Sequence, residues 1–424
     1  MNAITENKQG LKVLAAGAFL LLFMGIIYVW AVFVSPVSTY FGWEVGKVKL
    51  TASFMLCFFV IGILSGGKLQ TIIGVKLAAL IGGLMVAAGM TATAFIPMGI
   101  EGASFNYVSD GLFQCEDFST PRAPIFLIYL FYGIIGGFGV GMAYNAIVSS
   151  AQKWFPKNRG FATGIVVCAF GLSTVIFAPV VRALTKNFMV NQVFLILAVV
   201  FAAATLALFS FIKSPEQAGG PPPMKGKQYT TPEMLKTSRY YLIMFSLMLG
   251  TSVFFIINPE LMALAGARGL ENFAVYVVMF TGITNAVGRL VIPLLSDKIG
   301  REAADISILA VTALSAFLLC FAQGALLIIA IGMVAFCFGG YPGLYAVLTS
   351  ENFGMKSFGA NYGMVMVGFM ISAMFFPLFI NRIESQTIRF AVLGGFAVIG
   401  AVLVLILKII NMKREKKDET VING

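Results

Sequence analysis

The 424-residue sequence contains no histidine, and its charged residues make up only 11% of the chain. The missing histidines exclude zinc sites with imidazole ligands and proton relays through imidazole. Soluble domains contain about a quarter charged residues, whereas this chain is 59% hydrophobic and has a mean hydropathy of +0.92. Polar residues are too few to cover so much apolar surface in water. We therefore expect an integral membrane protein without a separate soluble domain.

Cysteine is also scarce: the five cysteines, four of them in apolar segments, do not predict a disulfide framework. No motif predicts a metal or a cofactor. The net charge of +11 does not indicate a nucleic-acid partner, because Lys and Arg accumulate on cytoplasmic loops and tails of membrane proteins. The glycine-rich run from Gly133 is not a nucleotide-binding loop, since it lies in an apolar segment with no preceding strand. Its small residues predict close helix packing instead.

Long apolar segments recur from residue 11 to residue 411. A helix needs about 20 predominantly apolar residues to cross the hydrocarbon core of a bilayer. The segments therefore predict an all-α fold with twelve transmembrane helices, arranged as two six-helix bundles. Their approximate ranges are 11–35, 47–67, 75–97, 124–150, 160–185, 190–212, 239–258, 272–295, 304–322, 325–349, 358–380 and 388–411.

The distribution of Lys and Arg predicts the orientation of these helices. Twelve crossings place both termini on the same side, and most of the 29 basic residues fall in the tails and in the loops on that side. Cytoplasmic loops carry this excess, so we expect a multi-pass protein of the cell (inner) membrane with both termini cytoplasmic. The long outer loop, residues 98–123, is expected to be solvated.

A Pro/Gly/Lys-rich linker and an internal repeat divide the chain. The predicted organisation is a bundle over 1–212, a cytoplasmic linker over 213–238, a bundle over 239–411 and a cytoplasmic tail over 412–424. The segment from Trp154 aligns with that from Phe353, which places Phe170 on Phe369. The loop after the second span aligns with the loop after the eighth, which places Gly74 on Gly300. Repeated halves of this kind are typical of transporters with a substrate cavity between two bundles.

Arg289 is the basic residue that lies deepest within a predicted span. It precedes Asp297, at the cytoplasmic end of the eighth span, by eight residues, which is about 12 Å of helix. A cation at such a depth costs at least ~2.5 kcal/mol unless it meets water or an anion. No Asp or Glu lies well inside any predicted span, so the sequence points to an anionic substrate. Guanidinium matches a carboxylate with two parallel hydrogen bonds. The alternatives are hydrogen bonds to backbone carbonyls or a side chain extended toward the interface.

Several polar and aromatic residues are further candidates for substrate binding. Asn285 precedes Arg289 by one turn on the same helix face and would bind the ligand, orient the guanidinium or contact another helix. Tyrosine and tryptophan can bury a ring and still donate a hydrogen bond, but packing and interfacial positions remain open for them. These candidates are Tyr28, Trp30, Tyr144 and Tyr341.

A charged turn, Ser296-Asp297-Lys298-Ile299-Gly300-Arg301, connects the eighth and ninth spans on the cytoplasmic side. We expect its residues Asp297, Lys298, Gly300 and Arg301 to latch helix ends in one conformation. Such a latch would influence the transport rate more than the selectivity.

Together these features resemble the major facilitator superfamily, in particular its oxalate/formate antiporter family. SDKIGR from Ser296 is similar to the loop motif of the superfamily. The first-half counterpart is degenerate, with Thr71 where an Asp is usual. GVGMAYN from Gly139, KWFPKNRGFATG from Lys153, TPEMLKTSRYYL from Thr231 and NYGMV from Asn361 resemble stretches specific to the family.

The resemblance implies roles for individual residues. Arg289 matches the substrate-binding arginine of helix 8, and Tyr28 and Tyr144 match aromatic positions that line an anion cavity. The oxalate carrier of the family has a lysine on helix 11 where this chain has Phe369. The related monocarboxylate transporters have an Asp where this chain has Asn285, which argues against the same proton acceptor.

Charge balance then favours a monocarboxylate. One Arg balances one carboxylate, whereas a dianion would leave about one buried negative charge uncompensated. We expect a functional monomer that carries lactate, pyruvate, formate or a similar anion by alternating access, with a proton or a second anion as candidate co- or counter-substrate. An oxalate/formate-type antiporter or a carrier of an unrelated organic anion is the alternative.

A membrane enzyme would need clustered His, Asp, Cys or Ser–base groups at membrane depth, and the sequence shows no such cluster. A channel or receptor fits two repeated halves less well, and a cationic-drug exporter would need an acidic cavity residue.

Overall fold

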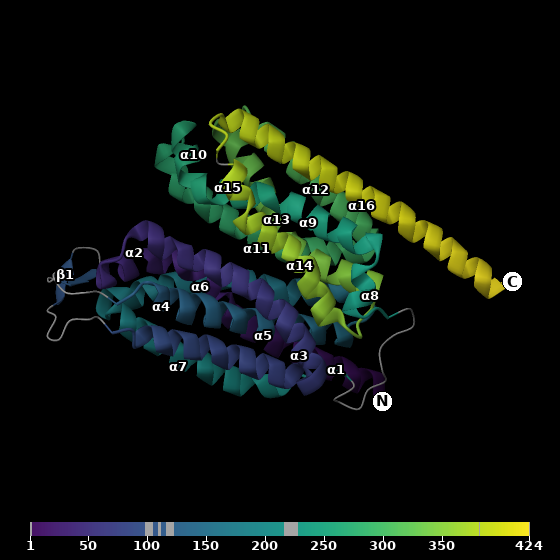
Figure 1. Cartoon of the computed structure of the whole chain (residues 1–424), viewed down its shortest axis with the longest axis horizontal. Helices are drawn as coiled ribbons and strands as arrows, with labels where there is room; N and C mark the ends of the chain where they lie inside the picture. Colours follow the sequence, from purple (N-terminus) through teal and green to yellow (C-terminus); the bar gives the residue numbers. More distant parts are fainter. Residues whose placement is uncertain are drawn as a thin grey trace. The chain divides into compact units, whose positions relative to one another are not determined.

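The computed structural model describes residues 2–97, 105–108, 112–115, 123–215, 228–380 and 382–423. Its elements pack as two compact units, labelled by element in Figure 1. The first unit contains Met1–Trp154 and Ala169–Pro222, and the second contains Phe155–Cys168 and Pro223–Gly424. Helix α6 therefore starts in the second unit and continues into the first.

The first unit consists of long apolar helices joined by short turns. Helix α1 is followed by the 3-10 segment η1 and by α2, so the first predicted span is a single crossing with a local change of helix type. The elements are α1 (Asn2–Met24), η1 (Gly25–Val29), α2 (Trp30–Phe41), α3 (Val45–Ala94), α4 (Phe126–Ile128), the π-helical η2 (Tyr129–Gly136), α5 (Gly137–Trp154), α6 (Arg159–Asn187), α7 (Val190–Leu208) and η3 (Phe209–Phe211).

Helix α3 accounts for two of the predicted spans. It contains 50 residues and a non-helical residue, Gly74, with φ 82° and ψ 163°. A straight helix of that length would measure about 75 Å, against about 30 Å of hydrocarbon, so the chain crosses twice here. Eleven helices in the described part are long and apolar enough to span a membrane. With α3 counted twice, they agree with the twelve predicted crossings.

The second unit is likewise built from long apolar helices. Helix α16 packs along α12 and α9, and α11 packs along α13 (Figure 1). The elements are α8 (Thr231–Leu235), α9 (Ser238–Ile257), η5 (Asn258–Glu260), α10 (Leu261–Ala267), η6 (Glu271–Phe273), α11 (Ala274–Ile299), α12 (Arg301–Leu319), α13 (Gly324–Phe353), α14 (Phe358–Met374), α15 (Phe376–Ile380) and α16 (Gln386–Asn423).

The aligned loop glycines of the two units share an unusual backbone. Gly300, between α11 and α12, has φ 90° and ψ 153°, close to the values of Gly74. Side chains with a Cβ rarely adopt positive φ, so both loops depend on glycine for the same sharp turn. This common geometry supports the internal repeat.

Small residues bring the helices of the first unit into close contact, as the glycine-rich run predicted. A Cβ on Gly137 would lie 2.5 Å from the carbonyl oxygen of Met55, and a Cβ on Gly141 would overlap that of Phe59. Because Gly137 and Gly141 are one turn apart on α5, they form a strip along which α3 packs backbone to backbone.

Two details differ from the sequence expectations. The expected all-α fold has a small exception: strands β1 (Phe105–Val108) and β2 (Leu112–Cys115) form an antiparallel hairpin within the predicted outer loop. The acidic residues of that loop lie outside the described residues, as do positions 216–227 of the predicted linker.

Helix α16 continues through the predicted tail to Asn423, because no Pro or Gly interrupts residues 401–423. The fold class itself, a multi-pass helical membrane protein, is confirmed.

Candidate functional site

Arg289 is buried in α11 and is anchored by its own helix. Its side chain is 2% exposed, and its Nε donates a hydrogen bond to the Oδ1 atom of Asn285 at 2.9 Å. The i to i+4 spacing allows this contact. The guanidinium therefore has a protein partner, and the contact is one of those that the sequence allowed for Asn285. Since the Asn285 amide is neutral, this bond orients the guanidinium without neutralising its charge.

The start of α6 covers this part of α11 through small residues. A Cβ on Gly160 would overlap the carbonyl oxygen of Pro293, and a Cβ on Gly164 would lie 2.9 Å from that of Leu290. One turn further along, the Cys168 thiol donates to the carbonyl oxygen of Ala286 at 3.5 Å. The thiol also interacts electrostatically with Arg289. These three small residues, spaced four apart, let the two backbones approach closely. We call this contact the α6–α11 seam.

Phe369 lies in an aromatic cluster of the second unit. Its ring centroid is 5.0 Å from that of Phe255 in edge-to-face geometry and 5.8 Å from that of Phe338. Phe338 also stacks on Phe254 at 3.9 Å. Phe369 is 1% exposed, so the position where the oxalate carrier has a lysine is occupied here by a packed, uncharged ring.

Tyr28 and Tyr144 come together around one phenylalanine of the first unit. Phe170 meets Tyr28 at 5.4 Å and Tyr144 at 5.2 Å, both edge to face, and it stacks on Phe59. Phe170 is the residue that the internal repeat aligns with Phe369. Each unit thus places an aromatic cluster at the same repeat position. The alignment of the two halves pairs Phe170 with Phe369, but it did not predict that other aromatic rings surround both residues.

The polar groups of Trp30 and Tyr341 are engaged within their own units. The Trp30 indole N–H donates to the carbonyl oxygen of Val48 at 3.1 Å, and its ring packs on Tyr132. The Tyr341 hydroxyl bonds Thr312 Oγ1 at 3.1 Å, and both residues are almost completely buried. The structure therefore places both side chains in helix packing, while their predicted part in substrate binding stays a prediction.

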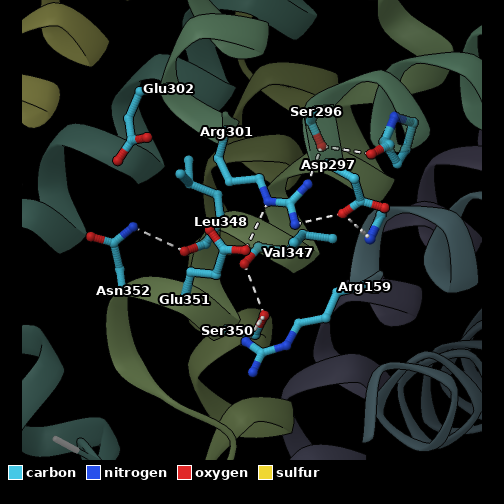
Figure 2. A network of polar contacts seen from close by, with 12 residues as sticks. Arg159, Ser296, Asp297, Arg301, Glu302, Val347, Leu348, Ser350, Glu351 and Asn352 are labelled. Atoms are coloured by element: carbon cyan, nitrogen blue, oxygen red, sulfur yellow. Dashed lines mark hydrogen bonds and ion pairs between the residues drawn. The ribbon is translucent and has the colours of Figure 1, made fainter. Parts of the chain in front are cut away.

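The charged turn forms a compact ion-pair network at the end of the seam (Figure 2). Asp297 accepts hydrogen bonds from the backbone N–H groups of Gly160 (3.0 Å) and Phe161 (2.8 Å) at the start of α6. It also pairs with Arg301 at 2.6 Å. A carboxylate at a helix N-terminus satisfies free N–H groups and interacts favourably with the helix dipole. Asp297 therefore ties the first turn of α6 to the end of α11.

Arg301 extends the network to α13 (Figure 2). Its Nε atom pairs with Glu351 at 2.8 Å, and its Nη1 atom donates to Ser296 Oγ at 2.7 Å. Arg159 donates from Nη1 to Ser350 Oγ at 3.2 Å. Arg159, Ser350 and Glu351 were not among the predicted residues, because their contacts join segments far apart in the sequence. We call Asp297, Arg301, Glu351 and the start of α6 the Asp297 network.

The other predicted latch residues have different places. Gly300 forms the positive-φ turn that lets α12 start directly after α11, whereas Lys298 is exposed. In the first-half loop, Thr71 bonds the carbonyl oxygen of Lys68 at 2.6 Å on an exposed surface. It therefore makes a local contact where the second-half loop has the Asp297 carboxylate.

Asp305 is an acidic residue that the sequence analysis did not single out. It is one turn into α12 and is completely buried. It lies close to the start of the helix, so the expectation that no Asp or Glu lies well inside a span is not contradicted. Within the described residues, no cluster of three or more His, Cys, Asp or Glu side chains could hold a metal ion.

Comparisons with known proteins identify the family of the chain. The sequence profile of the Major Facilitator Superfamily matches residues 15–377. An uncharacterised transporter of this type, YhjX of Escherichia coli, is 26% identical over 362 residues, covering 82% of each chain. The oxalate:formate antiporter of Oxalobacter formigenes is 24% identical, over 80% of this chain and 76% of its own.

Solved structures show the same fold. The proton:xylose symporter XylE of E. coli superposes with a TM-score of 0.68, covering 94% of this chain and 96% of its own. The two sequences are only 15% identical, so this similarity concerns the fold and not the substrate.

Proposed function

Since this chain belongs to the Major Facilitator Superfamily and is therefore a membrane transporter, not an enzyme, we propose that it carries small monocarboxylate anions by alternating access. One observation carries the proposal: a buried guanidinium, Arg289, is oriented by the neutral amide of Asn285. The planar guanidinium matches the two oxygens of a carboxylate, which is the geometry that this proposal assigns to the substrate.

The charge of the site supports a monovalent substrate. One guanidinium and one carboxylate form a pair without net charge, and the attraction between them offsets the desolvation cost of each ion. A dicarboxylate would bring a second negative charge, and the ring of Phe369 in the aromatic cluster offers it no cation.

Oxalate/formate exchange is the second candidate, because the oxalate:formate antiporter is among the relatives. We propose the cell membrane as the location, with both termini cytoplasmic, on the charge distribution of the loops. Uptake of labelled pyruvate, lactate, formate and oxalate into proteoliposomes, with and without trapped unlabelled anion, separates the candidates. The expected result is uptake of one or more monocarboxylates with weak competition by oxalate. Oxalate transported faster than every monocarboxylate would contradict the charge argument.

A lysine at position 369 is expected to improve the recognition of dianions. In a Phe369→Lys variant, the ammonium group would be partly stabilised by the faces of Phe255 and Phe338 and would add the second positive charge. Competition by oxalate against labelled formate should then occur at a lower oxalate concentration than in the unchanged protein. Phe369→Met, which keeps an apolar side chain, is the matched control. No gain in competition by the lysine variant would count against the charge balance.

A further inference from the structure

Asp305 is the buried acidic group that the proposed binding site does not use. It lies in α12, one turn after Arg301, with an exposed fraction of 0%. Both of its carboxyl oxygens are buried, and the polar side chain that lies against them is the uncharged Tyr345. A carboxylate in this situation loses its hydration without gaining a cation in return.

The groups around Asp305 are polar but do not supply a cation. On α13, the Tyr345 hydroxyl lies close to the carboxyl group but donates to Ser246 Oγ of α9 at 2.9 Å. Tyr341, one turn before Tyr345, interacts with Asp305 electrostatically and bonds Thr312. These two hydrogen-bonded pairs are buried and connect α13 to α9 and to α12.

The charged groups nearby do not neutralise Asp305. Arg301 lies one turn earlier, but its guanidinium is taken by Ser296, Asp297 and Glu351. Glu302, in the turn before Asp305, adds a second negative charge and accepts a hydrogen bond from Asn411 of α16. Among the described residues, no Lys or Arg forms an ion pair with Asp305. The remaining way to remove the buried charge is to bind a proton.

From this arrangement we propose that Asp305 is a proton-binding site that couples anion transport to a proton gradient. The inference rests on the proposed transport of carboxylates and adds the coupling ion. When the carboxyl group binds a proton, its charge is removed and α12 packs against α13 without strain. When the proton leaves, the Tyr345 hydroxyl can turn its hydrogen from Ser246 to the carboxylate. The exchange of this hydrogen bond between α9 and α12 links the protonation state to helix packing in the unit that contains Arg289.

The test compares two modes of transport in proteoliposomes. Pyruvate–pyruvate exchange needs no net proton movement, whereas uptake driven by an alkaline interior does. We expect Asp305→Asn to keep exchange and to lose the stimulation by the pH gradient, together with the proton flux reported by a trapped pH dye. Glu302→Gln, an acid-to-amide change one turn earlier, is the control and should keep both modes. Gradient-driven uptake by Asp305→Asn equal to that of the unchanged protein would overturn the proposal. Uptake by the unchanged protein that does not respond to the pH gradient would also overturn it.

A spectroscopic measurement keeps the outcome independent of transport. Infrared spectra of the purified protein should contain a band of a protonated carboxyl group that shifts in heavy water. This band should disappear in Asp305→Asn and move in Asp305→Glu, the variant to use if the amide variant fails to fold. Absence of such a band across the working pH range would refute proton binding at Asp305. If exchange of every anion fails while the band is present, the proposed function fails and the proton site does not.

Discussion

Replacing Arg289 with alanine is expected to reduce labelled pyruvate exchange by about 30-fold or more. Removing one partner of a buried, hydrogen-bonded charge pair costs on the order of 2–5 kcal/mol, and each 1.4 kcal/mol is about tenfold in affinity. The loss should appear as a higher half-saturating concentration and as weaker binding of pyruvate to the purified protein.

Arg289→Lys should retain part of the activity. Lysine keeps the positive charge but has neither the planar fork nor the Nε group that Asn285 holds, so we expect about a tenfold loss on the same affinity scale. Arg182→Ala is the control for charge alone, because Arg182 is exposed on α6, and it should leave exchange unchanged. Pyruvate exchange that survives Arg289→Ala would remove the assignment of this residue to the substrate site.

Breaking the Asp297 network at Asp297 itself is expected to change the speed of transport and not the affinity. Asp297→Asn loses the ion pair with Arg301 and weakens the acceptance of the two N–H groups of α6. Charge-assisted hydrogen bonds contribute about 1.5–3 kcal/mol, so the maximal exchange rate should fall about tenfold or more on the usual scale of 1.36 kcal/mol per decade. The half-saturating concentration should stay close to that of the unchanged protein.

The neighbouring Lys298 provides the matched control for Asp297. Its side chain is exposed and lies in the same turn, so Lys298→Ala should exchange pyruvate at the normal rate. A variant at Asp297 with normal maximal rate but poor affinity would show that this network acts on the binding site and not on the conformational change.

The parts of the fold that follow from local pattern were predictable. Apolar runs of about 20 residues gave the crossings, and the repeat gave the matching turns at Gly74 and Gly300, which share their backbone conformation. The Asn285–Arg289 contact follows from helical spacing alone. Each of these features depends on residues close together in the sequence or on a repeated motif.

The features that were missed depend on tertiary contacts or on small shifts of a helix end. The burial of Asp305 depends on α12 starting at Arg301 and on which face meets α13, neither of which hydropathy reveals. The pairing of Arg301 with Glu351 joins residues 50 positions apart. The outer-loop hairpin, β1 and β2, consists of two four-residue strands, too short for a periodic pattern to stand out.

The central claim is that the Arg289 guanidinium binds the carboxylate of the substrate, and a distance measurement tests it most directly. Solid-state NMR on protein with ¹⁵N-labelled arginine and carboxyl-¹³C pyruvate reports dipolar coupling between the two groups. We predict a coupling that corresponds to about 4 Å, the range of a guanidinium–carboxylate pair, and that disappears in Arg289→Lys. A coupling that persists unchanged in that variant, or pyruvate bound without any coupling to arginine, would contradict the account.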